Sequence, residues 1–248
     1  MFAIYKKELR SYFINAIGYV YVGVFLAAAA LLLCMTTLGA SSYNTSSYFM
    51  ALIFSFVILI PLLTMKLFAE EKKLRTEQLL LTAPVTLWGM VLGKFFAAFT
   101  LFAGTMIVSG INFFPLYVFA NEERAAQEYS VMHIGPSTAQ IIGCTIGVVL
   151  IGACFIAIGM FISSLTENQL AAAVITVAII VLMLILNVVN NYLDSYVARF
   201  VIDWVCIMSR FEAFSNGYID FAAILYYLSL TGVFLLLTVR IYDKRRWG

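Results

Sequence analysis

The stretch FAEEKKLRTEQLLLTAP, residues 68–84, interrupts two long apolar runs and decides how the chain must be placed in space. Its charged side chains are Glu70, Glu71, Lys72, Lys73, Arg75 and Glu77, and Lys66 lies just upstream. Such charges are costly inside hydrocarbon, so this charged segment is expected at an aqueous face of a membrane. Its basic residues favour the cytoplasmic face. A cytoplasmic partner would therefore bind here.

The composition predicts an integral membrane protein. The chain has 248 residues, of which 63% are hydrophobic and 11% charged, and its mean hydropathy is +0.99. A soluble domain has about a quarter charged residues. We therefore expect a single transmembrane domain over residues 1–248, without a separate soluble domain. The net charge of +2 is too small to indicate a nucleic-acid partner.

Six apolar runs are long enough to cross a bilayer, which takes about 20 residues each. They are residues 16–38, 48–67, 90–119, 138–163, 170–191 and 221–241. None shows the period-2 alternation of a membrane barrel, so the predicted fold class is all-α with six transmembrane helices. The third and fourth runs are long and are expected to tilt or kink, and Pro61 and Pro115 are the expected kink sites.

The distribution of Lys and Arg predicts the orientation. With the N-terminus inside, twelve of these residues fall on the cytoplasmic side and three, Arg124, Arg199 and Arg210, outside. The positive-inside rule then places both termini in the cytoplasm, and we expect a multi-pass protein of a prokaryotic cytoplasmic membrane.

Two segments outside the spans are also expected to be helical. Residues 2–16 are amphipathic at helical spacing, with Lys7, Glu8 and Ser11 opposite an apolar face, and predict a helix lying in the cytoplasmic interface. The alternative is an extension of the first span. Residues 196–219 are rich in aromatic and apolar side chains but broken by charge, which predicts a re-entrant helical element on the external side.

The sequence holds two motifs that resemble catalytic or nucleotide-binding sites, and both lack residues that the chemistry requires. Glu70, Glu71 and Arg75 match E-E-x-x-x-R, which resembles intramembrane prenyl-protein endopeptidases, but such a site needs histidines. The one histidine, His133, is expected on the opposite side of the membrane. Residues 89–95 fall short of a phosphate-binding loop. We therefore predict no enzymatic activity, cofactor or metal site, and expect Lys94 to extend toward the membrane interface.

Small residues in the fourth span predict close helix packing. Gly143 and Gly147 form a G-x-x-x-G motif, followed by Gly152 and Gly159. The four cysteines lack a C-x-x-C pair and are interpreted as free thiols.

Three segments resemble the type-2 permeases of ABC exporters, closest to the gliding-motility and nitrous-oxide-cluster branch. They are residues 68–84 with Gly93 and Lys94, residues 158–169, and residues 210–220 with 226–229. The resemblance covers nearly the whole chain. Where the family usually has glycine before the threonine of the first segment, this chain has Arg75, which we expect to keep that segment more helical.

The resemblance implies a function and partners. Two cytoplasmic ABC ATPase subunits on separate chains would hydrolyse ATP, and a second permease copy or homologue would complete the pathway. An auxiliary subunit with an extracytoplasmic domain is a further implied partner. ATPase docking is expected at Glu70, Glu71, Arg75 and Glu77, with a second cytoplasmic contact at Thr166, Glu167, Asn168 and Gln169. The alternatives are a non-transporting scaffold or mechanical coupler driven by the same ATPase, and the intramembrane protease.

Overall fold

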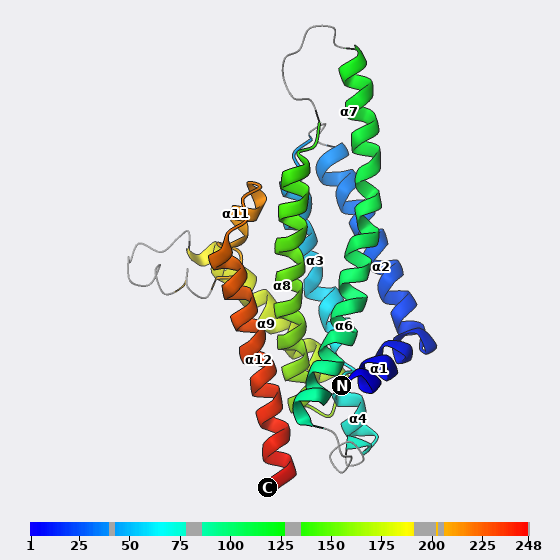
Figure 1. Ribbon diagram of the computed structural model, residues 1–248, viewed down its shortest axis with the longest axis vertical. Helices are drawn as coiled ribbons and strands as arrows, with labels where there is room; N and C mark the ends of the chain where they lie inside the picture. The colour runs from blue at the N-terminus through cyan, green and yellow to red at the C-terminus, as the bar shows by residue number, and fades with distance from the viewer. Residues whose placement is uncertain (40–42, 78–85, 127–134, 191–201, 203–205, 248) are drawn as a thin grey trace.

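The computed structural model describes residues 1–39, 43–77, 86–126, 135–190, 202 and 206–247. All regular secondary structure in these ranges is helical, which confirms the predicted all-α class. Both termini lie at the same end of the molecule (Figure 1), here called the terminal face.

Six helices of the described residues are long and apolar enough to cross a membrane, as the sequence predicted. Their bounds are α2 Ala16–Leu33 with a π-helical turn η1 Cys34–Leu38, α3 Ser46–Thr64, α6 Leu87–Ser109, α8 Thr138–Leu165, α9 Gln169–Asn190 and α12 Phe221–Trp247. A 3-10 turn, η2 Gly110–Phe113, continues α6 into α7 Phe114–Ala126. This change of helical geometry lies directly before Pro115, where a kink was expected.

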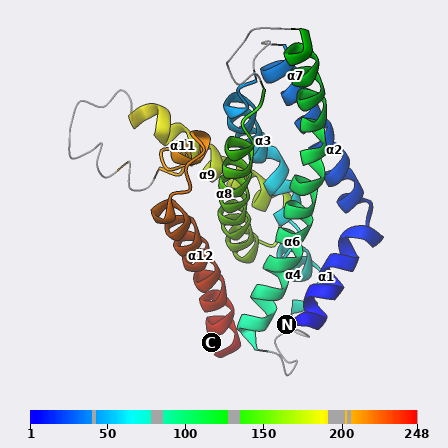
Figure 2. The same cartoon turned by 45° about the horizontal axis from the view of Figure 1, so that its top comes forward.

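Helix α8 is the central element of the bundle, packed against α3, α6, α9, α11 and α12 (Figures 1 and 2). Its glycines permit the close contacts. A Cβ atom on Gly152 would lie 2.2 Å from the ring of Phe102, and one on Gly159 would lie 2.3 Å from the Thr64 hydroxyl. Helices α6 and α3 can therefore approach α8 only because these positions have no side chain.

Helix α1, Phe2–Ile14, is separate from the first span, as expected for an interfacial helix. The chain turns at Asn15, whose ψ of 144° breaks the helical path into α2. Helix α1 then lies across the lower end of α6 (Figure 2). One detail of the predicted amphipathic pattern was wrong: Glu8, assigned to the polar face, points into the protein, where it meets Lys94.

The predicted re-entrant element falls partly on described residues. Helix α11, Phe211–Ser215, packs on α8 through two fully buried aromatic rings, Phe211 and Phe214, which lie against Gly147. The Tyr227 hydroxyl of α12 donates to the Ile207 carbonyl at 2.7 Å. Residues 206–217 are thus a packed part of the bundle. Residues 196–201 and 203–205 of the expected element lie outside the described residues.

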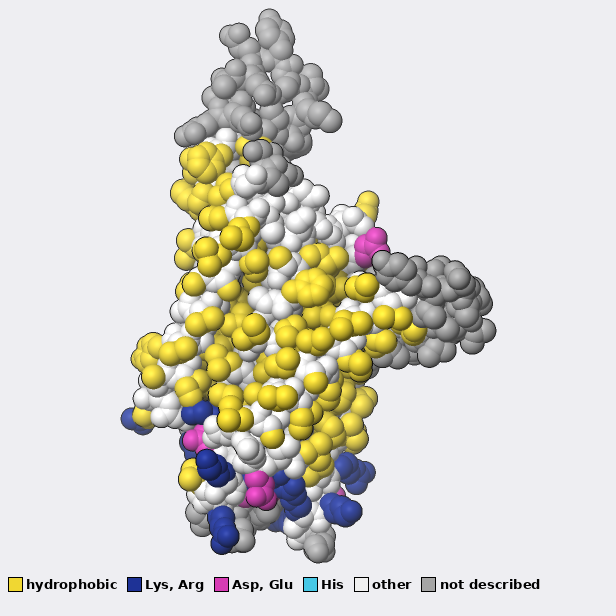
Figure 3. Space-filling model, turned by 180° about the vertical axis from the view of Figure 1, so that it is seen from behind, with side chains coloured by type: hydrophobic (Ala, Val, Ile, Leu, Met, Phe, Trp, Pro, Cys, Tyr) yellow, Lys and Arg dark blue, Asp and Glu magenta, His cyan; other side chains and the backbone are white. Residues whose placement is uncertain are grey.

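The surface agrees with a membrane location. Hydrophobic side chains cover the middle of the molecule, and Lys, Arg, Asp and Glu gather at the end that carries the termini (Figure 3). The long helices therefore present their apolar sides to lipid, and the terminal face presents charge to water.

Candidate docking face at the termini

The charged segment begins with a turn after α3 that α8 holds in place. Helix α3 ends at Thr64, and a short helix α4, Ala69–Lys73, follows it. The backbone N–H groups of Phe68 and Ala69 both donate to the Ser163 hydroxyl at 3.1 Å, and this hydroxyl donates to the Met65 carbonyl at 3.2 Å. A serine of α8 thus satisfies the free N–H groups at the start of α4, as an N-cap residue would.

A buried lysine connects α4 to α1 and α6. The Lys94 ammonium lies 2.9 Å from Glu71 and 3.1 Å from Glu8, and donates to the Leu67 carbonyl at 2.7 Å. Its side chain is 1% exposed. A buried charge is tolerated only when it is paired and hydrogen-bonded, and Lys94 meets both conditions. We call Lys94, Glu8, Glu71 and the Leu67 carbonyl the Lys94 hub. The prediction that Lys94 extends toward the membrane interface was therefore wrong, because its ammonium group is buried inside the protein.

Helix α1 has a second anchor beside the hub. The buried Tyr12 hydroxyl donates to the Leu63 carbonyl at 3.1 Å, near the end of α3. Burial raises the pKa of Tyr12 well above its usual value, so this hydroxyl keeps its proton and remains a donor. Lys7 lies on the outer side of the hub, 3.5 Å from Glu71.

The end of α8 joins α4 to α12. The Lys72 ammonium donates to the Ser164 carbonyl, and the Arg245 guanidinium donates to the same oxygen at 3.3 Å. Cations at a helix C-terminus also interact favourably with the helix dipole. Arg245 in addition pairs with Glu77 at 2.9 Å. We call Lys72, Arg245, Glu77 and the Ser164 carbonyl the Ser164 junction.

Arg75 gives the charged segment a sharp turn, which corrects the expectation that it keeps the segment helical. Its φ is +56°, in the left-handed region. The Arg75 N–H donates to the Lys72 carbonyl and the Thr76 N–H to the Glu71 carbonyl, both at 3.0 Å. These two bonds form a Schellman motif with Arg75 at the position where glycine is preferred. The sharp turn that glycine would permit is therefore formed here with Arg75.

The four residues predicted to dock an ATPase divide into two pairs. Glu71 and Glu77 are turned inward, 15% and 17% exposed, into the hub and the junction. Glu70 is 38% exposed, 4.0 Å from Lys66, and Arg75 is exposed. Leu74 lies between them in sequence order and is 63% exposed, a large apolar side chain at the tip of the turn. The sequence prediction did not include Leu74, although a leucine between Lys73 and Arg75 stands out among the charges.

The second predicted contact lies beside the first. Residues 166–168 link α8 to α9, which begins at Gln169, and α4 contacts both of these helices. Glu167 and Asn168 are exposed, whereas Thr166 and Gln169 are half-buried. The Asn168 side chain accepts from the Leu170 N–H at 3.0 Å and starts α9. The structure thus brings the two predicted segments together on the terminal face.

The protease interpretation is not favoured. Glu71, one of the two glutamates of the E-E-x-x-x-R motif, is paired with Lys94 at 2.9 Å. His133 lies outside the described residues. Within the ranges that the structure describes, no group of three or more His, Cys, Asp or Glu side chains could hold a metal ion.

Six long apolar helices, with α8 at their centre and a charged, internally bonded segment at one end, are the architecture of a polytopic membrane protein. A family model described as ABC-2 family transporter protein matches residues 35–241. The chain belongs to this family. It is therefore the membrane permease component of an ABC transporter, whose partners are ABC ATPase subunits. No curated protein matches the chain.

Proposed function

We propose that this chain is the permease of an ATP-driven exporter and that its ATPase docks on the terminal face. The observation that carries the proposal is that the charged segment is bonded to four helices at once. It meets α1 and α6 at the Lys94 hub, and α8 and α12 at the Ser164 junction. A free surface loop could bind a partner without moving the spans. Because this segment is bonded to α1, α6, α8 and α12, a displacement of the segment would also move those helices.

The exposed and the inward residues have different roles in this proposal. Glu70, Leu74 and Arg75 form the docking surface, with Glu167 and Asn168 beside it. An apolar side chain surrounded by charges supplies both contact area and register. Behind it, the hub and the junction transmit the displacement. ATP binding would close two ATPase subunits beneath a pair of permeases and shift their spans as rigid bodies.

The orientation follows from charge. The exposed basic residues Lys6, Arg10, Lys73, Lys244 and Arg246 all lie on elements of the terminal face. The positive-inside rule then supports a cytoplasmic terminal face in a prokaryotic inner membrane. The predominantly apolar spans favour a lipidic or hydrophobic cargo, and the resemblance implies an auxiliary subunit on the other side.

Co-purification with the cognate ABC ATPase tests the docking surface. The charge reversals Glu70→Lys and Arg75→Glu change exposed residues, and we expect them to reduce recovery of the co-expressed ATPase. A matched reversal, Glu212→Lys, changes an exposed acid at the far end of the bundle and should leave recovery unchanged. Wild-type recovery with the double variant Glu70→Lys, Arg75→Glu would contradict the proposal.

A further inference from the structure

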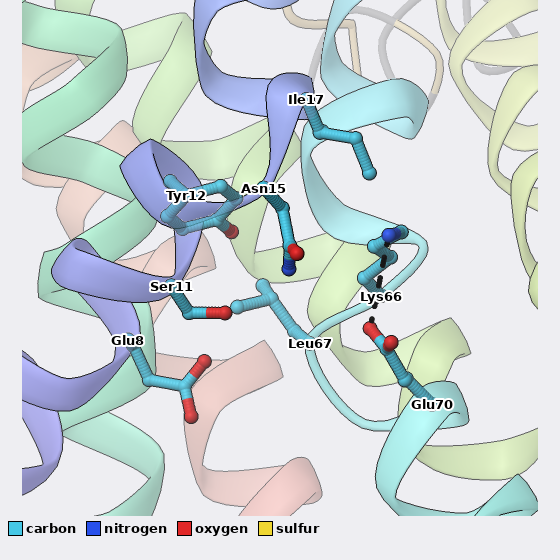
Figure 4. A pocket seen from close by; sticks show the side chains of 8 residues that line it. All are labelled: Glu8, Ser11, Tyr12, Asn15, Ile17, Lys66, Leu67 and Glu70. Carbon is cyan, nitrogen blue, oxygen red and sulfur yellow. Dashed lines mark ion pairs between the residues drawn. The ribbon is translucent and has the colours of Figure 1, made fainter.

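The two sides of α1 differ in chemistry. Figure 4 shows Glu8, Ser11 and Asn15 on the inner side, directed into a pocket opposite Lys66 and Glu70. This pocket has a volume of about 40 Å³, enough for water molecules but not for a ligand. The inner side of α1 therefore faces the charged segment, and Glu8 and Tyr12 hold the helix against the protein there.

The outer side of α1 carries a basic concavity of about 560 Å³. It is lined by Ala3, Lys6, Lys7, Arg10, Ser11 and Ile14. No acidic side chain lines it. Lys6 and Arg10 are exposed and stand one helical turn apart, so their charges lie on the same side of the helix. Lys7 is paired with Glu71, so Lys6 and Arg10 are the exposed cations that could bind an anion here.

Exposed apolar side chains adjoin this concavity. Ile14 is at its edge and is exposed, as is Phe13 next to it. The Phe13 ring packs edge-on against the exposed Tyr19 ring of α2 at 5.6 Å between centroids. Cations and apolar groups so arranged on one amphipathic helix are typical of binding to a membrane surface with anionic lipids.

We propose that α1 and the α1–α2 turn form a site for the headgroup of an anionic phospholipid. The lipid phosphate lies between Lys6 and Arg10, and the acyl chains run along Ile14, Phe13 and Tyr19. An acidic peptide would satisfy the two cations but leave these apolar side chains in contact with nothing apolar. Lipid satisfies both, and it is already present where the spans begin. The site lies outside residues 35–241, the region that matches the family.

The site has a mechanical consequence. The same helix holds Glu8 in the Lys94 hub and Tyr12 at the end of α3. A lipid bound to the outer side of α1 would restrain the helix on that side, while the Lys94 hub restrains it on the inner side. The lipid proposal itself does not depend on the ATPase, so it stands or fails apart from the proposed function.

Photocrosslinking tests this site in the purified full-length chain. The chain is reconstituted in nanodiscs of mixed phosphatidylcholine and phosphatidylglycerol that contain a photoreactive analogue of one lipid or the other. Crosslinked peptides are mapped by mass spectrometry. We expect phosphatidylglycerol to be enriched on residues 2–20. The double variant Lys6→Gln, Arg10→Gln should lower that enrichment roughly tenfold, since each charge interacts with an anionic surface.

The control variant is Lys244→Gln, Arg246→Gln. It removes the same charge from exposed residues of the terminal face but leaves the concavity intact. It should keep the enrichment on α1. Equal crosslinking of both lipids in the wild type would overturn the proposal, as would an equal loss in the control. Displacement of phosphatidylglycerol by inorganic phosphate would assign the site to a soluble anion. Loss of ATPase co-purification in the Lys6→Gln, Arg10→Gln variant, with unchanged lipid enrichment, would assign the site to a protein partner.

Discussion

The two ends of the bundle are held together by different chemistry. At the terminal face, α1, α4, α6, α8 and α12 are joined by ion pairs and hydrogen bonds around Lys94 and Ser164. At the other end, α11 is held on α8 by the rings of Phe211 and Phe214 against Gly147, and by backbone atoms of Phe214 and Gly217 against Gly143. Gln140 of α8 also donates to the Ser215 carbonyl at 2.8 Å. Ion pairs depend on partners that can be exchanged. The close contacts at the glycines depend on shape, and the hydrogen bonds beside them join neutral groups. The terminal face is therefore the end where an incoming protein can redistribute bonds.

Removing the hub cation should have the largest effect on stability. Lys94→Met leaves Glu8 and Glu71 without their shared partner, and losing one member of a buried ion pair costs about 3–5 kcal/mol. Lys7 lies 3.7 Å from Glu8 and offsets part of this cost. Thermal unfolding in detergent measures the loss. The triple variant with Glu8→Gln and Glu71→Gln should recover a large part of it, and no recovery would show that Lys94 acts by packing alone.

Adding a methyl group to α8 should have the next largest effect. Gly152→Ala forces Cβ into the Phe102 ring, and overpacking of this kind costs about 1–3 kcal/mol. Gly147→Ala should cost less, since the nearest atoms of Phe211 and Phe214 are 3.0 Å away. Gly104→Ala on α6 is the matched control, because nothing lies within 4 Å of its Cβ. Equal melting temperatures for Gly152→Ala and Gly104→Ala would contradict the described packing.

The turn at Arg75 predicts a smaller, favourable change. A left-handed conformation costs a non-glycine residue roughly 1–2 kcal/mol, so Arg75→Gly should stabilise the chain by up to about 1 kcal/mol. Lys73→Gly, two residues earlier and inside α4, should destabilise it by a similar amount. Unfolding measurements on the two variants give opposite signs if the Schellman turn forms, and the same sign if the segment is a continuous helix.

The weakest effect on stability is expected at Arg245. It is 35% exposed, and its pair with Glu77 is accordingly screened by water. Partly exposed pairs contribute about 0.2–1 kcal/mol, so Arg245→Gln should change stability by no more than that, and less at high salt. Thermal unfolding at two sodium chloride concentrations, without chemical denaturant, measures this change in stability. A loss as large as that of Lys94→Met would place the Ser164 junction on a level with the hub.

The sequence predicted the spans well and the site only in outline. Long apolar runs identify membrane helices without any knowledge of packing, and the same holds for α1 as a separate helix. The direction of a charged side chain depends instead on what another helix supplies. Glu71 and Glu77 were grouped with Glu70 and Arg75 because all four are charged, yet Lys94 and Arg245, distant in sequence, draw the first two inward.

The error at Arg75 has a different origin. The expectation of a more helical segment followed from the absence of the glycine that would permit a sharp turn, and arginine is indeed favourable inside a helix. The two Schellman hydrogen bonds and the fixed start of α4 at Ser163 outweigh that preference. Local propensity could not reveal a constraint imposed by α8, more than eighty residues further along the chain.

The central claim is that docking and transmission use different residues of the charged segment. Spin labels at positions 73 and 219 would report the distance between α4 and the far end of the bundle. They require only Cys34→Ser as background, since the other three cysteines are buried. In the ATPase complex, we expect ATP to change this distance in the wild type. In Glu71→Gln, ATPase recovery should be unchanged and the ATP-dependent change lost. The same distance change in Glu71→Gln as in the wild type, with equal ATPase recovery, would contradict the account.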